Sequence, residues 1–98
     1  MSGPIRRRLR LFGAVQGVGL RWRAVHAASL TGATGWIRND ADGSVALEIQ
    51  APEAQIDEML SLIQRGAYVR VERMEARRVP VVEGERGFTV LDDGPDAF

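Results

Sequence analysis

A glycine-rich stretch, GAVQGVGLR at residues 13–21, lies between an alternating segment and an alanine-rich segment. Glycine lets the backbone approach a ligand closely, and successive inward-pointing N–H groups form a concave site for an anion. A helix that begins directly after such a loop adds the positive end of its dipole. Arg21 follows the last glycine, and its planar guanidinium matches two phosphate oxygens. These residues could hold a phosphate or a carboxylate, but an ordinary connecting loop with a surface arginine has the same spacing.

Composition narrows the chemistry that this chain can perform. Because the sequence has no cysteine, disulfides, thiolate metal sites and thiol catalysis are excluded. The sole histidine, His26, has no partners in a recognisable catalytic triad, and we interpret it as a solvated helix residue. We find no set of metal ligands in the sequence, so we expect neither a metal nor a cofactor.

Charge and hydropathy limit the partners. The 13 basic residues are balanced by 13 acidic residues, whereas a nucleic-acid-binding domain of this size is more often clearly basic. No apolar run approaches the roughly 20 residues of a membrane span, and the N-terminus lacks the apolar segment of a signal peptide. We therefore expect a monomeric, cytoplasmic protein that binds neither nucleic acid nor membranes. Its 98 residues suffice for one domain, 1–98, with flexible ends at 1–5 and 92–98.

Alternating segments predict the strands. In residues 8–12 the leucines and the arginines fall on opposite faces, which is typical of a strand with one solvated side. Residues 34–38 and the alternating apolar residues of 45–49 predict a hairpin, because NDADG between them has turn chemistry. A fourth strand is expected with a bulge at Arg73–Met74, and GFTVL at 87–91 is expected to close the sheet.

Two helices are predicted. Residues 20–30 predict the first, which Gly32 is expected to end. Its residues at near-helical spacing are Trp22, Val25, Ala28 and Ser29. The second helix is expected to have Pro52 at its first helical position and to end at Gly66. Its apolar stripe, at i, i+3, i+4 and i+7, consists of Ile56, Met59, Leu60 and Ile63.

The order of the elements defines the fold class. It is strand, helix, strand, strand, helix, strand, with a short final strand. Two amphipathic helices need one sheet face against which to bury their stripes, and the other face can then stay polar. We predict an α+β, ferredoxin-like two-layer sandwich (βαββαβ) with two helices packed on one face of an antiparallel sheet.

Two motifs at a fixed interval carry a family resemblance. GAVQGVGLR, followed by GWIRN at residues 35–39, closely resembles the acylphosphatase family. The similarity extends over nearly the whole chain, including PE at the second helix and VERME in the fourth strand. Members of this family have the ferredoxin-like fold and hydrolyse the carboxyl–phosphate bond of acyl phosphates, releasing a carboxylate and inorganic phosphate.

The resemblance implies a role for each matching residue. It assigns Arg21 as the arginine that holds the phosphate and Asn39 as the residue that positions the attacking water. The phosphoryl oxygens would be held by five backbone N–H groups, those of Gln16, Gly17, Val18, Gly19 and Leu20. Because an acyl phosphate has a good leaving group, positioning and charge stabilisation can suffice without a metal.

Three positions depart from the family pattern. Leu20 stands where an aromatic residue is usual, which we interpret as a packing change. Ala51 stands where a glycine often precedes the second helix. Asp40 follows the asparagine where a small polar residue is common, and its charge near an anion site puts affinity in question.

Two alternatives to an enzyme remain open. One is a non-catalytic module of the same fold that binds anions or nucleic acid, because fold does not fix function. RNA-binding sheets carry stacking aromatics on their open face, whereas the expected open face here is mostly Arg, Glu and Gln. The other is a regulatory domain detached from a larger enzyme. Trp22 and Trp36 could stack on a substrate, but we expect both to pack in the core or against the site wall.

Overall fold

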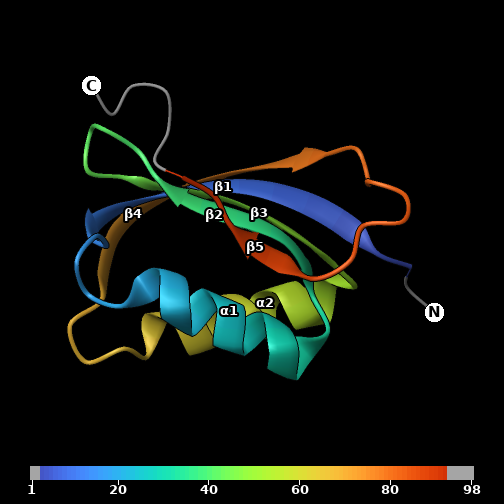
Figure 1. Ribbon diagram of the computed structural model, residues 1–98, viewed down its shortest axis with the longest axis horizontal. Coiled ribbons are helices and arrows are strands. Elements are labelled where there is room, and N and C mark those ends of the chain that lie inside the picture. Colours follow the sequence, from blue (N-terminus) through green and yellow to red (C-terminus); the bar gives the residue numbers. More distant parts are fainter. Residues whose placement is uncertain (1–2, 93–98) are drawn as a thin grey trace.

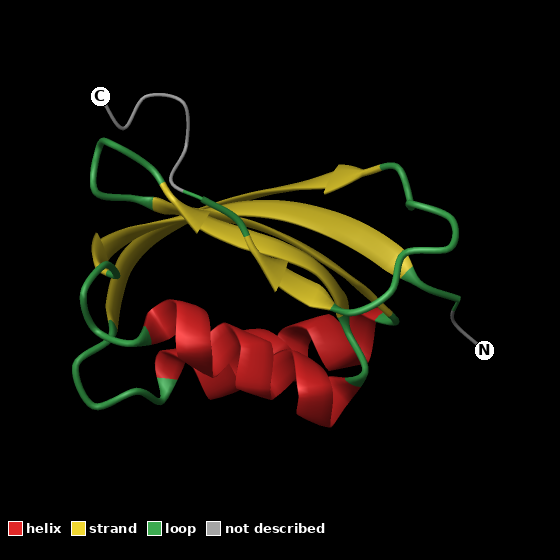
Figure 2. Cartoon of the chain, viewed as in Figure 1, coloured by secondary structure: helices red, strands yellow, loops and turns green. Residues whose placement is uncertain are grey.

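The computed structural model describes residues 3–92, in which two helices cover one face of a five-stranded sheet (Figures 1 and 2). The elements in chain order are β1 (Ile5–Ala14), α1 (Leu20–Thr31), β2 (Thr34–Asn39), β3 (Val45–Ala51), α2 (Glu53–Gln64), β4 (Arg70–Val79) and β5 (Phe88–Val90). This arrangement is the ferredoxin-like α+β sandwich that the order of the elements predicts. The ends expected to be flexible fall largely on residues 1–2 and 93–98, which lie outside the described part.

The sheet has the strand order β4-β1-β3-β2-β5. Strands β1 to β4 pair in an antiparallel manner, as predicted, whereas the short β5 pairs in parallel with β2, so the sheet is mixed. The chain reaches β5 only after crossing from the opposite edge of the sheet, which allows it to run alongside β2 in the same direction. This crossing brings the end of the described chain next to α1 and to the loop at residues 15–19.

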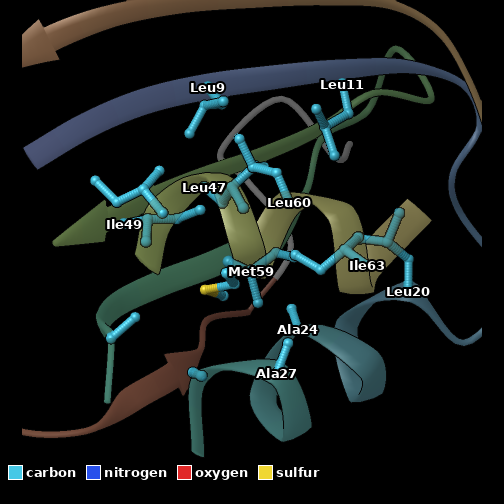
Figure 3. Packing of buried hydrophobic residues seen from close by; sticks show 14 of the residues in the cluster. Leu9, Leu11, Leu20, Ala24, Ala27, Leu47, Ile49, Met59, Leu60 and Ile63 are labelled. Carbon is cyan, nitrogen blue, oxygen red and sulfur yellow. The ribbon is translucent and has the colours of Figure 1, made fainter. Parts of the chain in front are cut away.

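The buried face of α1 differs from the one predicted. Its buried residues are Leu20, Ala24, Ala27 and Ala28. Trp22 is 69% exposed and Val25 is 38% exposed, and Ser29 is exposed as well. The prediction took large apolar side chains as markers of burial, whereas α1 packs against α2 through its alanines, and small side chains allow close approach (Figure 3). The helix ends as expected, with Gly32 in the left-handed conformation at φ 76°.

Helix α2 has the predicted apolar stripe. Its four residues Ile56, Met59, Leu60 and Ile63 are buried in the core (Figure 3). Its ends differ from the prediction: Pro52 is the N-cap and Arg65 the C-cap. Gly66 follows the C-cap instead of ending the helix itself. The absence of a side chain at this position is explained by packing, since a Cβ there would lie 2.9 Å from Arg23 Cδ.

The face of the sheet away from the helices is polar. Arg6 lies on this face and is only 2% exposed. Its buried charge is compensated because it donates to Glu48 at 2.6 Å and to Glu85 at 2.7 Å. Trp36 also lies on this face, between the guanidinium groups of Arg8 and Arg38, each 5.3 Å from its ring. The expectation that Trp36 packs in the core or in the site wall is therefore wrong, because alternation places Trp36 opposite the buried Gly35 and Ile37.

The predicted bulge in β4 exists, one residue earlier than expected. The pairing with β1 shifts between Phe12, which faces Arg73, and Gly13, which faces Val71. Glu72 is thus the extra residue. The bulge lies where β1 turns toward the glycine-rich loop.

Candidate active site

The loop at residues 15–19 joins β1 to α1 and carries the glycines of the first motif. Gly17 and Gly19 have φ values of 71° and 77°, a backbone region that is strained for other residues. Gly19 is the N-cap of α1, and no side chain caps the helix. Within residues 3–92, the backbone N–H groups of residues 16–20 donate to no other protein group. The loop therefore offers a run of donors at a helix N-terminus.

The side chain of Leu20 has a different role from its N–H group. It is 1% exposed and belongs to the hydrophobic core. Leu20 therefore packs in the core, as interpreted; whether its replacement of an aromatic residue loosens the loop stays a prediction. The start of α1 is anchored in the core directly after the glycines.

A glutamine side chain joins this loop to the β2–β3 turn. Gln16 Nε2 donates to the carbonyl oxygens of Asp40, at 2.7 Å, and Ser44, at 2.8 Å. Within the turn, Asp42 accepts hydrogen bonds from the hydroxyl and the N–H of Ser44, which lowers the pKa of Asp42. The turn is thus ordered by its own side chains and fixed to the loop that follows β1.

Arg21 and Asn39 line one cavity although they lie in different elements. Arg21 is in the first turn of α1, and Asn39 is the last residue of β2. The cavity has a volume of about 500 Å³, and both residues form its wall together with Gly17 and Gly19. Asn39 Oδ1 is buried and has no hydrogen-bond partner within the described part of the chain. The site therefore combines a guanidinium, a set of unpaired amides and an unpaired amide oxygen.

The negative charge of Asp40 is balanced by its neighbours. Arg38 Nε lies 3.0 Å from Asp40 Oδ1, and Arg10 Nη2 lies 3.3 Å from Asp40 Oδ2. Arg10 also interacts with Asp42, so two guanidinium groups face two carboxylates at this turn and compensate their charges. Because its charge is compensated, Asp40 should repel an anion at this site less than the sequence alone suggests.

Two aromatic side chains near the cavity were not fully anticipated. Trp22 lines the cavity, which agrees with the second of its two expected positions, the core or the site wall. His26 is exposed, as predicted, but it also stacks on Trp22, with the ring centroids 5.5 Å apart and the planes inclined by 2°. The spacing i, i+4 on one helix is the signal that could have predicted this pair.

Metal ligands and membrane spans were also sought. Among residues 3–92, no group of three or more His, Cys, Asp or Glu side chains is arranged to hold a metal ion. None of the helices formed by these residues is long and apolar enough to cross a membrane.

Comparisons with known proteins place the chain in a family. The family model described as Acylphosphatase matches residues 7–90. An acylphosphatase of Leuconostoc mesenteroides is 36% identical over 75 residues, which cover 74% of this chain and 83% of the relative. One of Thermococcus kodakarensis is 35% identical over 88 residues, which cover 89% of this chain and 96% of the relative. The crystal structure of acylphosphatase from Bacillus subtilis matches with a TM-score of 0.81 at 25% identity, covering 89% of this chain and 98% of that chain.

Proposed function

This chain belongs to the acylphosphatase family, and from that premise we propose that it hydrolyses acyl phosphates in the cavity between the 15–19 loop and the end of β2. Acylphosphatases cleave the carboxyl–phosphate bond and release a carboxylate and inorganic phosphate. One observation carries the proposed mechanism: Arg21, Gly17, Gly19, Leu20 and Asn39 line one cavity, and neither the N–H groups of this loop nor Asn39 Oδ1 has a partner among residues 3–92.

The phosphate end of the substrate is held by the N–H groups of residues 16–20 and by Arg21. Oriented amides and a helix N-terminus supply positive potential without an ionised side chain. The guanidinium of Arg21 adds a full charge and a fork that matches two phosphoryl oxygens. Charge on these oxygens is stabilised by donors that are already in place before the reaction.

Asn39 positions the attacking water. Its Oδ1 accepts a hydrogen bond from that water, which satisfies a buried oxygen that has no partner among residues 3–92. The water oxygen forms a bond to phosphorus while the bond from phosphorus to the carboxyl oxygen breaks. The carboxylate leaves with the electron pair, and the water's proton passes to a phosphoryl oxygen. Asparagine acts here by placement, since it is not a base.

We propose that no metal takes part in this reaction. A carboxylate is a weak base and leaves readily, so the leaving group needs little assistance. The amides and Arg21 supply the positive field that a bound cation provides in other phosphoryl-transfer enzymes. We further propose that residues 1–98 form one domain and that the protein is a cytoplasmic monomer that binds no nucleic acid. The balanced charge argues against nucleic-acid binding, and the lack of cysteine fits a cytosolic location.

Steady-state hydrolysis of benzoyl phosphate, measured with and without a strong chelator, tests the proposal. We expect turnover that chelation does not change and competitive inhibition by inorganic phosphate. Loss of turnover on chelation, restored by a divalent cation, would contradict the metal-free mechanism. Absence of turnover under both conditions would favour the non-catalytic anion-binding module.

A further inference from the structure

The proposed chemistry leaves one wall of the cavity without a role. Beside the polar groups, the cavity is lined by apolar side chains of α1 and β5: Trp22, Val25 and Val90. They are 69%, 38% and 45% exposed, respectively. Apolar side chains that stay exposed around a concave site are typical of a surface that binds a ligand.

The ring of Trp22 is held by a neighbour. It stacks in parallel on His26, one helical turn further along α1. The helix buries its alanines instead, so neither ring is needed for the core. A supported aromatic ring at the rim of a cavity offers a rigid surface for an apolar group at low entropic cost.

The apolar wall continues beyond the cavity. A neighbouring hollow of about 350 Å³ shares Val25 and is lined further by Ala28, Ala33 and Phe88. Both hollows are lined by residues of α1 and β5, which contact each other at the edge of the sheet. Apolar side chains are therefore exposed beyond the cavity as well as in its wall.

We propose that Trp22, Val25 and Val90 form a subsite for the acyl group, and that the enzyme favours acyl phosphates with an apolar acyl group, aromatic or aliphatic. This inference rests on the proposed function, because the phosphate must occupy the polar end of the cavity. An acyl phosphate with such a group is charged at one end and apolar at the other. The cavity wall combines the same two characters, because Arg21, Gly17, Gly19 and Asn39 line it together with the apolar side chains of Trp22, Val25 and Val90.

The ratio of kcat/KM for benzoyl phosphate to that for acetyl phosphate tests the inference. Wild type is compared with Trp22→Ala, Trp22→Phe and Leu30→Ala. Leu30 is the matched control, because it is an apolar residue of α1 that is 64% exposed and does not line the cavity. Comparing each variant with wild type cancels the different intrinsic reactivities of the two substrates.

We expect Trp22→Ala to lower kcat/KM for benzoyl phosphate about tenfold, mainly through KM, and for acetyl phosphate only about twofold. Trp22→Phe should restore most of the loss, and Leu30→Ala should resemble wild type. Inhibition by benzylphosphonate should weaken in Trp22→Ala more than inhibition by methylphosphonate. This second measurement reports binding alone.

Equal losses with both substrates, or none, would overturn the subsite while leaving the proposed function intact. A wild-type protein that is dimeric in sedimentation and becomes monomeric as Trp22→Ala, with equal losses on both substrates, would assign the patch to self-association. Wild type that hydrolyses neither substrate would remove the proposed function, and the subsite with it.

Discussion

Gln16 joins the loop at residues 15–19 to the β2–β3 turn, and we predict that it is a positioning residue. Its two hydrogen bonds, to the carbonyl oxygens of Asp40 and Ser44, tie residues 16–20 to the turn directly after Asn39. If the loop holds the phosphate and Asn39 holds the water, this link sets the distance between the nucleophile and phosphorus. Small errors in that distance are costly to catalysis.

The substitution Gln16→Met keeps the length of the side chain and removes both donors. Neither carbonyl is then left unpaired, because Asp40 O still accepts from the N–H of Gly43 at 3.1 Å and Ser44 O from that of Asp40 at 2.9 Å. Each lost bond should therefore cost only about 0.5–1.5 kcal/mol of unfolding free energy, roughly 1–3 kcal/mol in total. For a domain of this size we expect Tm to fall by about 5–15 °C. We expect kcat to fall further than stability explains, by about ten- to a hundredfold.

The assay compares kcat, the inhibition constant of phosphate and Tm with those of a matched control, Gln50→Met. The Gln50 side chain also makes two bonds to the backbone, accepting from Val82 N–H at 2.8 Å and donating to Val82 C=O at 2.9 Å. Its Oε1 accepts a third bond from Arg6 Nη1 at 3.1 Å, so the control loses at least as many bonds as Gln16→Met. Gln50 pairs with Thr34, at the other end of β2 from Asn39. The control should lose stability and keep kcat. If Gln16→Met also keeps kcat while Tm falls, Gln16 merely stabilises the turn and the positioning argument is wrong.

Three further predictions concern the charged and polar groups. Arg21→Gln should abolish useful turnover and weaken phosphate inhibition, and Arg21→Lys should rescue poorly because an ammonium lacks the guanidinium fork; near-wild-type kcat/KM in Arg21→Gln would refute the assignment. Asn39→Ala should lower kcat by orders of magnitude and leave the inhibition constant of phosphate nearly unchanged, whereas an equal loss of phosphate binding in a protein of normal Tm would make Asn39 part of the anion site. Burial favours a higher pKa for Glu85, but hydrogen bonds from Arg6 and Thr34 and the Arg6 charge hold that pKa below its ordinary value of 4.5. The ionised carboxylate therefore stabilises the fold above that pH, so thermal melts of Glu85→Gln should show a deficit at neutral pH that narrows as pH falls below about 4.5; a deficit independent of pH would contradict this.

The residues that the sequence could predict are those with strong local signals. The hairpin follows from the turn chemistry of NDADG, and Gly43 indeed has a φ of 89°. The apolar stripe of α2 follows from the helical spacing of its four large apolar residues, which places all of them on one face of the helix. The loop at residues 15–19 follows from its glycines. In each case neighbouring residues contain the whole signal.

The features that the sequence could not predict depend on contacts between distant segments of the chain. The parallel pairing of β5 is set by where the chain crosses, which no local pattern encodes. The two bonds of Gln16 span 24 and 28 positions, so nothing in the loop itself indicates them. The compensation of Asp40 requires Arg10, which reaches it from another strand.

The alanines of α1 connect the core to the specificity of the site. A helix packed closely through Ala24, Ala27 and Ala28 must place its larger apolar residues elsewhere on its surface. At about 100° per residue, Trp22 lies about 200° around the helix from the buried Leu20. It therefore points away from the core and stands at the cavity beside Arg21. The same packing that buries the alanines leaves an aromatic ring exposed at the cavity, where we propose that it contacts the acyl group.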